Sequence, residues 1–173
     1  MIRQNIKISF LIIMLIAFQS CFDLGLYISE VPLGSPTGQK PDKDLIGIWE
    51  RISDKSTPDD SGSIEFTLFN EHEYVIRVHG GNEKNLARAF IVKVGKFFFL
   101  NIQELSENER KFVFCSYKIS DSKDLVLNFV SDSLFKEYEP KSSRKLFKFI
   151  RKNLDNPELF DKETKILLVK KEN

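Results

Sequence analysis

The sequence predicts an all-β protein: an antiparallel up-and-down meander closed as a β-barrel of about eight strands, with an amphipathic helix packed outside. Short strand-like runs recur at even intervals between positions 44 and 130, and turn-forming residues separate them. The 16 Phe, against two Met and one Trp, favour the kind of aromatic core that strands build. Beyond position 130 the hydrophobic period changes from that of a strand to that of a helix.

The first 20 residues have the pattern of a secretory signal peptide. Arg3 and Lys7 precede an unbroken apolar run over positions 10–18, and polar residues follow it. The run is shorter than the roughly 20 apolar residues that a helix needs to cross a bilayer. We therefore expect export and removal of residues 1–20.

Positions 16–21 resemble the processing site of a bacterial lipoprotein signal, with Phe18 where that pattern usually has an aliphatic residue. The resemblance implies cleavage after Ser20, acylation of Cys21 with fatty chains such as palmitate, and a place in the bacterial cell envelope. Membrane lipid would then be one partner of the chain. Phe22 follows the cysteine where aspartate would favour inner-membrane retention, so the outer membrane is favoured.

Cys21 and Cys115 are the two cysteines of the chain. If Cys21 carries lipid, Cys115 has no partner and the exported protein has no intramolecular disulfide. The alternative is a Cys21–Cys115 bridge in a secreted protein without lipid. Cys115 alternates with Val113 and Tyr117, which predicts a buried, small apolar residue rather than a reactive thiol.

The charge balance argues against a nucleic-acid partner. Once Arg3 and Lys7 leave with the signal peptide, basic and acidic residues nearly cancel over the mature chain. Nucleic-acid-binding domains instead carry a basic patch or stripe.

Residues 21–43 are expected to form a tether between the membrane and the folded domain. Pro32, Gly34, Pro36, Gly38 and Pro41 interrupt this stretch, which has no sustained hydrophobic period. Its first apolar residues either enter the lipid or pack on the domain: Phe22, Leu24, Leu26, Tyr27 and Ile28.

The folded domain is expected over residues 44–173. Its predicted strands cover positions 48–52, 64–69, 74–78, 88–94, 97–105, 111–119 and 125–130. Gly95-Lys96, between two apolar runs, predicts a tight hairpin. A last strand over 165–170 is expected to pair with 48–52, which closes the sheet and removes an exposed edge.

Alternating apolar residues assign one side of each strand to the core. Every second residue from Val113 to Ile119 shares the predicted core face, and Phe112 and Phe114 lie on the other, partly wet face. The run 97–100 is apolar on both faces, so we expect the C-terminal helix to cover its outer side.

An amphipathic helix is predicted over residues 142–154, after a short helical turn near 131–135 and an interruption at Pro140. Its apolar side consists of Leu146, Phe147, Phe149, Ile150 and Leu154. Its basic side consists of Arg144, Lys145, Lys148, Arg151 and Lys152. The basic side is either a solvated surface or a contact with anionic lipid headgroups near the anchor.

Gly47-Ile48-Trp49, at the start of the first barrel strand, resembles the G-x-W signature of lipocalins. The resemblance implies an eight-stranded up-and-down barrel in which Gly47 and Trp49 close one end. In that family an arginine near the last strand stacks on the tryptophan. This chain has Lys170 and Lys171 there, so we expect a cation–π contact with lysine instead.

A longer likeness covers most of the mature chain. The Pro-rich stretch, positions 44–49 and 99–102, and the C-terminal helix and strand are similar to those of small lipocalin-like bacterial lipoproteins. This likeness implies architecture and location, and it implies no activity.

The sequence shows no constellation of catalytic or metal-binding residues. His72 and His79 lie in or beside turns and are expected to be exposed to solvent. The acidic pairs lack the alternation of a calcium loop and are expected to be turn residues: Asp59 with Asp60, and Asp121 with Asp124. Gly80-Gly81-Asn82 carries no phosphate-loop pattern. We therefore expect no catalytic residue, no metal and no cofactor.

The leading functional interpretation is a membrane-anchored, non-catalytic lipoprotein that holds a small apolar ligand inside the barrel. The alternative is a structural or protein-interaction lipoprotein whose barrel is filled by its own Phe side chains, because eight strands leave little interior space. The sequence indicates no particular ligand and no particular protein partner.

Overall fold

The computed structural model describes residues 25–51, 62–79, 85–105, 110–161 and 164–171. The predicted signal peptide and Cys21 lie outside the described residues, as do Asp59, Asp60 and Gly80-Gly81-Asn82. Within those ranges the one α-helix is α2, Ser143–Lys152.

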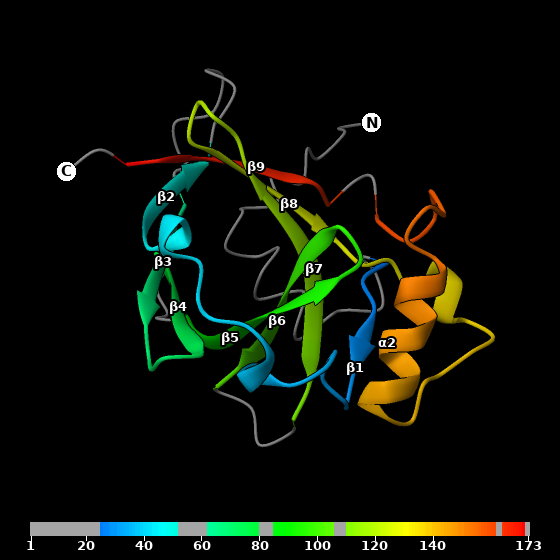
Figure 1. Ribbon diagram of the computed structural model, residues 1–173. Helices are drawn as coiled ribbons and strands as arrows, with labels where there is room; N and C mark the ends of the chain where they lie inside the picture. The colour runs from blue at the N-terminus through cyan, green and yellow to red at the C-terminus, as the bar shows by residue number, and fades with distance from the viewer. Residues whose placement is uncertain (1–24, 52–61, 80–84, 106–109, 162–163, 172–173) are drawn as a thin grey trace, which may run out of the picture.

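Eight antiparallel strands form a closed barrel in which each strand pairs with the next along the chain (Figure 1). In chain order they are β2 (Gly47–Arg51), β3 (Ser63–Leu68), β4 (Glu73–His79), β5 (Asn85–Val94), β6 (Phe97–Glu104), β7 (Phe112–Ile119), β8 (Asp124–Phe129) and β9 (Ile166–Lys170). β9 pairs with β2, with Trp49 opposite Lys170 and Arg51 opposite Leu168. The predicted meander and its closing pair are confirmed.

The predicted hairpin at Gly95-Lys96 joins β5 to β6. Gly95 has φ +60°, which glycine adopts without steric cost. A Cβ at this position would lie 2.8 Å from Leu154 Cδ1. The glycine therefore also lets the chain after α2 approach the barrel.

Two hydrophobic cores lie on the two sides of the barrel wall. The inner core takes a residue from every strand: Trp49, Ile64, Ile76, Ile91, Leu100, Cys115, Leu127 and Leu168. The outer core lies between β5–β7 and α2 and includes Val92, Val94, Phe99, Phe114, Leu146 and Ile150. Most of the described Phe side chains that join a core belong to the outer one, whereas Phe66 and Phe129 belong to the inner one.

The outer core corrects the expectation for β7. Phe112 and Phe114 are buried rather than partly wet. The reason is that the N-terminal segment and η3 (Ser133–Phe135) pack on that side of the sheet. The apolar run of β6 is covered as expected, because Phe99 packs in the outer core with α2.

α2 lies within the predicted range 142–154. Ser142 is its N-cap and accepts a hydrogen bond from the Lys145 N–H. Leu146 and Ile150 lie one turn apart and are completely buried against the sheet. The helix therefore contributes its apolar stripe to the outer core and leaves its other side to solvent.

Residues 25–43 do not form a free tether. β1 (Ile28–Ser29) adds an outer strand to the sheet by pairing with Val113 and Phe112 at the start of β7. Leu26 also forms an isolated bridge with Ser131. The folded body therefore includes residues before position 44.

Apolar burial explains why this Pro-rich segment is held on the barrel. Leu33 is completely buried, and its N–H donates to Asn101 Oδ1 at 2.7 Å. Tyr27 stacks on Phe135 with ring centroids 3.5 Å apart. The expectation of a spacer over 21–43 is wrong for 25–43, because these side chains cover the outer faces of β6 and β7. Of the two alternatives for its first residues, Leu26 and Tyr27 pack on the domain.

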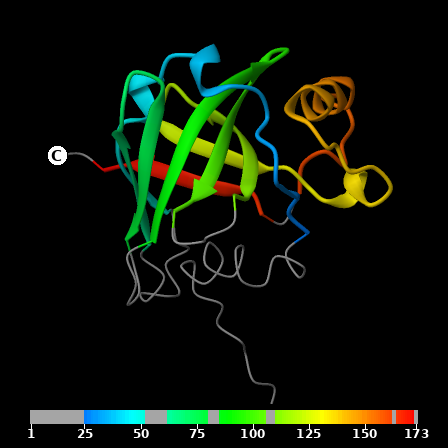
Figure 2. The same ribbon diagram turned by 90° about the horizontal axis from the view of Figure 1, so that it is seen from below.

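The two ends of the barrel differ (Figure 2). η2 (Lys43–Leu45) covers the end where β2 begins, and η1 (Pro36–Gly38) lies nearby. We call this the capped end. At the opposite end β2, β4 and β6 run into residues outside the described ranges. The dark-blue start of the described chain lies toward that opposite end.

Candidate functional site

The G-x-W segment closes the capped end. Trp49 is completely buried, and its indole N–H donates to the Leu45 carbonyl at 2.7 Å. Lys170 Nζ lies 5.2 Å from the centroid of the Trp49 ring and donates to the Asp44 carbonyl at 2.8 Å. Of the two lysines considered for this cation–π contact, Lys170 makes it.

Gly47 is needed for the same contact. Its φ is +129°, a conformation that residues with a Cβ rarely adopt. A Cβ there would lie 3.0 Å from Lys170 Cε. Glycine therefore makes room for the lysine stem that reaches Trp49.

Asp42 fastens the cap to the barrel. Tyr74 OH donates to the Asp42 carbonyl oxygen and Tyr117 OH to Asp42 Oδ2, each at 3.0 Å. Burial raises the pKa of both tyrosines, and the Asp42 carboxylate raises the pKa of Tyr117 further. Both hydroxyls therefore remain protonated donors. Sequence reasoning missed this cluster, because Asp42 was assigned to the tether.

The inner core fills the barrel from the capped end. Trp49, Leu100 and Cys115 have no exposed surface. Toward the opposite end Ala87 and Ile166 are 7% and 9% exposed, and at the capped end Ile46, Tyr117 and Ile119 are only partly buried against the same core. Burial raises the pKa of the Cys115 thiol, in keeping with its prediction as a small apolar residue.

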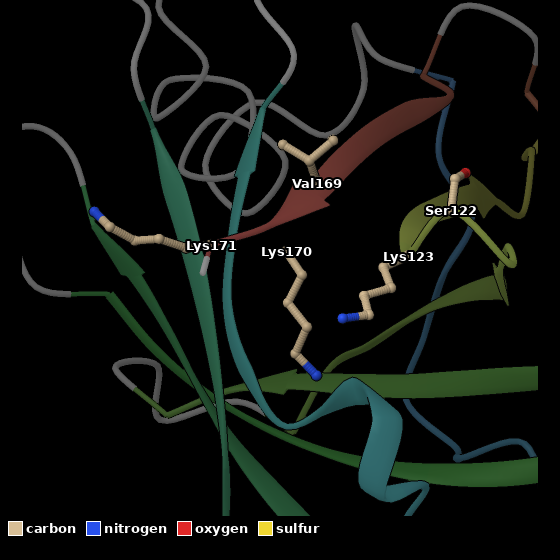
Figure 3. Close-up of a pocket in the computed structure, with 5 residues that line it drawn as sticks. All are labelled: Ser122, Lys123, Val169, Lys170 and Lys171. Atoms are coloured by element: carbon tan, nitrogen blue, oxygen red, sulfur yellow. The ribbon is translucent and has the colours of Figure 1, made fainter. Parts of the chain in front are cut away.

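A small basic hollow lies beside the capped end (Figure 3). Its volume is about 170 Å³, and it is lined by Ser122, Lys123, Val169, Lys170 and Lys171. Lys123 and Lys170 extend toward the same space, whereas Lys171 points away and pairs with Glu50 at 2.8 Å. Lys170 is already held by Trp49 and Asp44, so its main role here is structural.

A wider and more open hollow lies on the same end, near the turns that follow β5 and β7. Its volume is about 510 Å³, and its lining combines Phe97, Phe98, Tyr117 and Ile119 with Asp42, Asp44, Lys96 and Lys118. Lys93 Nζ lies 5.3 Å from the centroid of the Phe98 ring. This mixture of rings and opposite charges specifies no single class of ligand.

The basic side of α2 is exposed along its whole length. All five of its residues are exposed: Arg144, Lys145, Lys148, Arg151 and Lys152. Within the described ranges none of them forms an ion pair. They lie opposite Leu146 and Ile150, so their charges point away from the barrel.

The remaining chemistry-bearing candidates lie apart from one another. His79 is exposed as expected, and its Nε2 lies 2.9 Å from Glu65 Oε2, whereas the side chain of His72 is half-buried. Asp121 lies in the β7–β8 turn as expected, whereas Asp124 is the first residue of β8 and accepts hydrogen bonds from Ser120 and Ser122 of the turn. Among the described residues no group of His, Cys, Asp and Glu has the arrangement of a metal site.

Sequence reasoning did not predict the buried carboxylate of Glu73. The Glu73 side chain is only 6% exposed and accepts two hydrogen bonds from Arg88, at 2.8 and 2.5 Å, and one from Asn70 at 2.8 Å. Burial alone would raise the pKa of Glu73, but these donors and the Arg88 charge outweigh it, so the pKa lies below its ordinary value. Pairing across two strands leaves no local sequence signal.

Replacing Arg88 by methionine is expected to lower the free energy of unfolding by about 1–3 kcal/mol, because it leaves a buried carboxylate with one donor. Urea denaturation at neutral pH measures this loss. The matched control is Arg77→Met, which breaks the more exposed pair with Glu65 and should cost about 0–1 kcal/mol. Equal losses in the two variants would contradict the structural role of Glu73.

The same pair predicts acid sensitivity. Because the pKa of Glu73 is lowered on folding, the unfolded chain binds more protons than the folded chain in acid. The stabilisation is present above the ordinary glutamate pKa, about 4.3, and is lost as the pH falls through the lower, folded value. Arg88→Met should lose less stability over this acidic range than the parent chain.

No family model, curated protein or solved structure matches the chain. In the part of the chain that the structure describes, no helix has the length and apolar character needed to span a bilayer.

Proposed function

We propose that the protein is a lipid-anchored bacterial envelope lipoprotein, acylated at Cys21 and sorted preferentially to the outer membrane. Its barrel serves as a solid, non-catalytic structural or interaction body. The observation that carries the second part is the inner core, in which side chains from all eight strands are buried against one another.

The residues that fill the barrel differ from the Phe side chains that the composition suggested. Aliphatic residues with Trp49, Tyr74, Phe66 and Phe129 occupy the described interior, and most of the described Phe residues instead join the barrel wall to α2 and the N-terminal segment. The abundance of Phe therefore supports a body with two cores. It is weaker support for a barrel whose interior is filled by Phe side chains.

A ligand carrier is the second candidate, and one observation favours it. The inward-facing residues Ala87 and Ile166 are 7% and 9% exposed and lie toward the end opposite the cap. A small apolar ligand would enter there and stop at the inner core below Trp49.

Native mass spectrometry of the purified full-length chain separates the two candidates. We expect a mass that the polypeptide and its anchor account for, with no apolar compound released into organic solvent. A stoichiometric extracted compound would favour the carrier instead. Ala87→Leu is the matched variant: it should abolish such binding in a carrier, whereas in a solid barrel it should cost about 1–3 kcal/mol by overpacking.

A further inference from the structure

We infer that the basic side of α2 docks on anionic phospholipid headgroups and holds the barrel with that side toward the bilayer. The inference rests on the proposed acylation of Cys21. Three observations support it: the short chain between Cys21 and the barrel, the place where that chain joins the barrel, and the charges around that place.

The chain between anchor and barrel is short. Gly25 is held by its carbonyl, which accepts from the Asp132 N–H at 2.8 Å, and the Tyr27 N–H donates to the Val130 carbonyl at 2.9 Å. Four peptide steps separate Cys21 from Gly25, and at no more than about 3.6 Å per residue they span about 14 Å. An acylated Cys21 would therefore keep some face of the barrel against the headgroups.

The anchored segment joins the barrel beside α2. Tyr27 stacks on Phe135, and Phe135 contacts Phe149 of α2 with ring centroids 4.8 Å apart. Tyr138 extends this row by stacking on Phe149 at 4.8 Å. A rigid row of rings therefore couples the attachment point to the helix.

The charges select the face that turns toward the membrane. Asp161 Oδ2 and Asp132 Oδ1 lie 3.6 and 4.0 Å from where a Cβ of Gly25 would be, so acidic groups surround the attachment point. An anionic surface attracts the exposed basic side of α2, which has no carboxylate partner among the described residues, and offers no such attraction to the acidic residues at the attachment point. The barrel should therefore tilt onto α2.

Lysine footprinting of the mature, lipidated protein tests the inference. The protein is placed in phosphatidylcholine vesicles with or without about 30% phosphatidylglycerol, treated with an acetylating reagent and analysed by peptide mass spectrometry. We expect Lys145, Lys148 and Lys152 to react several-fold more slowly on the anionic vesicles. The protection should disappear in about 1 M NaCl, where the Debye length is about 3 Å.

Two exposed lysines provide the internal control. Lys118 and Lys123 flank the β7–β8 turn, which lies across the barrel from α2 in Figure 1. Their reactivity should be the same on both kinds of vesicle. Protection of these two lysines with free reaction at α2 would overturn the inference, as would equal reactivity of the α2 lysines on both vesicles.

Charge-reversal variants provide a second test of the docking. Lys148→Glu with Arg151→Glu should abolish the protection of Lys145 and Lys152, and the matched variant Lys118→Glu with Lys123→Glu should leave it unchanged. All four positions are exposed, so both variants should keep the parent circular dichroism spectrum. An identical footprint in both variants would count against docking through α2.

Failure of the anchor can be told apart from failure of docking. The Cys21→Ser chain should still float with the anionic vesicles at low salt and be released at high salt, because α2 is unchanged. No flotation at low salt would overturn docking, whatever the state of the anchor. A lipidated chain that lacks the footprint would overturn docking and leave the anchor standing.

Discussion

Replacing Trp49 by alanine is expected to lower the free energy of unfolding by about 3–5 kcal/mol. The indole is completely buried at the capped end, and it holds the cap through its hydrogen bond to Leu45 and the barrel closure through Lys170. Its loss leaves a cavity where β2 meets β9, the pair that closes the barrel. Urea denaturation followed by far-ultraviolet circular dichroism measures the effect.

Two neighbouring variants divide this loss into its parts. Lys170→Met keeps the stem and removes the charge over the ring, so it should cost about 0.5–2 kcal/mol. Trp49→Phe keeps a ring but loses the hydrogen bond to Leu45, and its cost should lie between those of Lys170→Met and Trp49→Ala. If Trp49→Ala costs less than about 1 kcal/mol, the packing described for the capped end is wrong.

Cys21→Ser is expected to move the protein from the detergent phase to the aqueous phase in a cloud-point partition, and to abolish metabolic labelling with palmitate. The reason is that each buried CH₂ of an acyl chain contributes about 0.8 kcal/mol to membrane binding, so several chains hold the protein essentially permanently. Nearly all of the Cys21→Ser protein should therefore be found in the aqueous phase.

Cys115→Ser is the matched control. Cys115 is buried in the inner core of the barrel, so this variant should keep the palmitate label and the detergent partition, with some loss of stability. A parent chain that takes up no palmitate would remove the anchor from the proposed function. It would leave the filled barrel and the role of Trp49 untouched.

Local sequence patterns predicted most of the secondary structure of this protein. Strict alternation placed Val113 and Cys115 on the core face of β7, Gly95 marked a hairpin that needs a positive φ, and Ser142 marked the start of α2. The closing pair of β2 with β9 also followed, because a barrel with an unpaired edge invites aggregation. These features depend on residues close together in the chain or on a general property of sheets.

Contacts between distant residues decided the rest. Leu33 meets Asn101, 68 residues away, and Asp42 meets Tyr117, 75 residues away. These contacts hold a segment rich in Pro and Gly on the outer face and the capped end of the barrel. The pairing of Glu73 with Arg88 likewise depends on the register of β4 against β5. The hydrophobic period of a strand shows which of its sides is apolar. It does not show which segment covers that side.

By itself, the sequence determined the strands, the helix and its two faces, the pairing that closes the barrel, and the tryptophan at its end. Each of these is encoded in spacing along the chain. The tertiary structure alone decided that the interior is packed mainly with aliphatic side chains while most of the described phenylalanines lie outside, and that the described fold already includes Gly25, four positions after Cys21. Both depend on which surfaces meet in three dimensions, because apolar area is buried wherever the closed sheet leaves a complementary face.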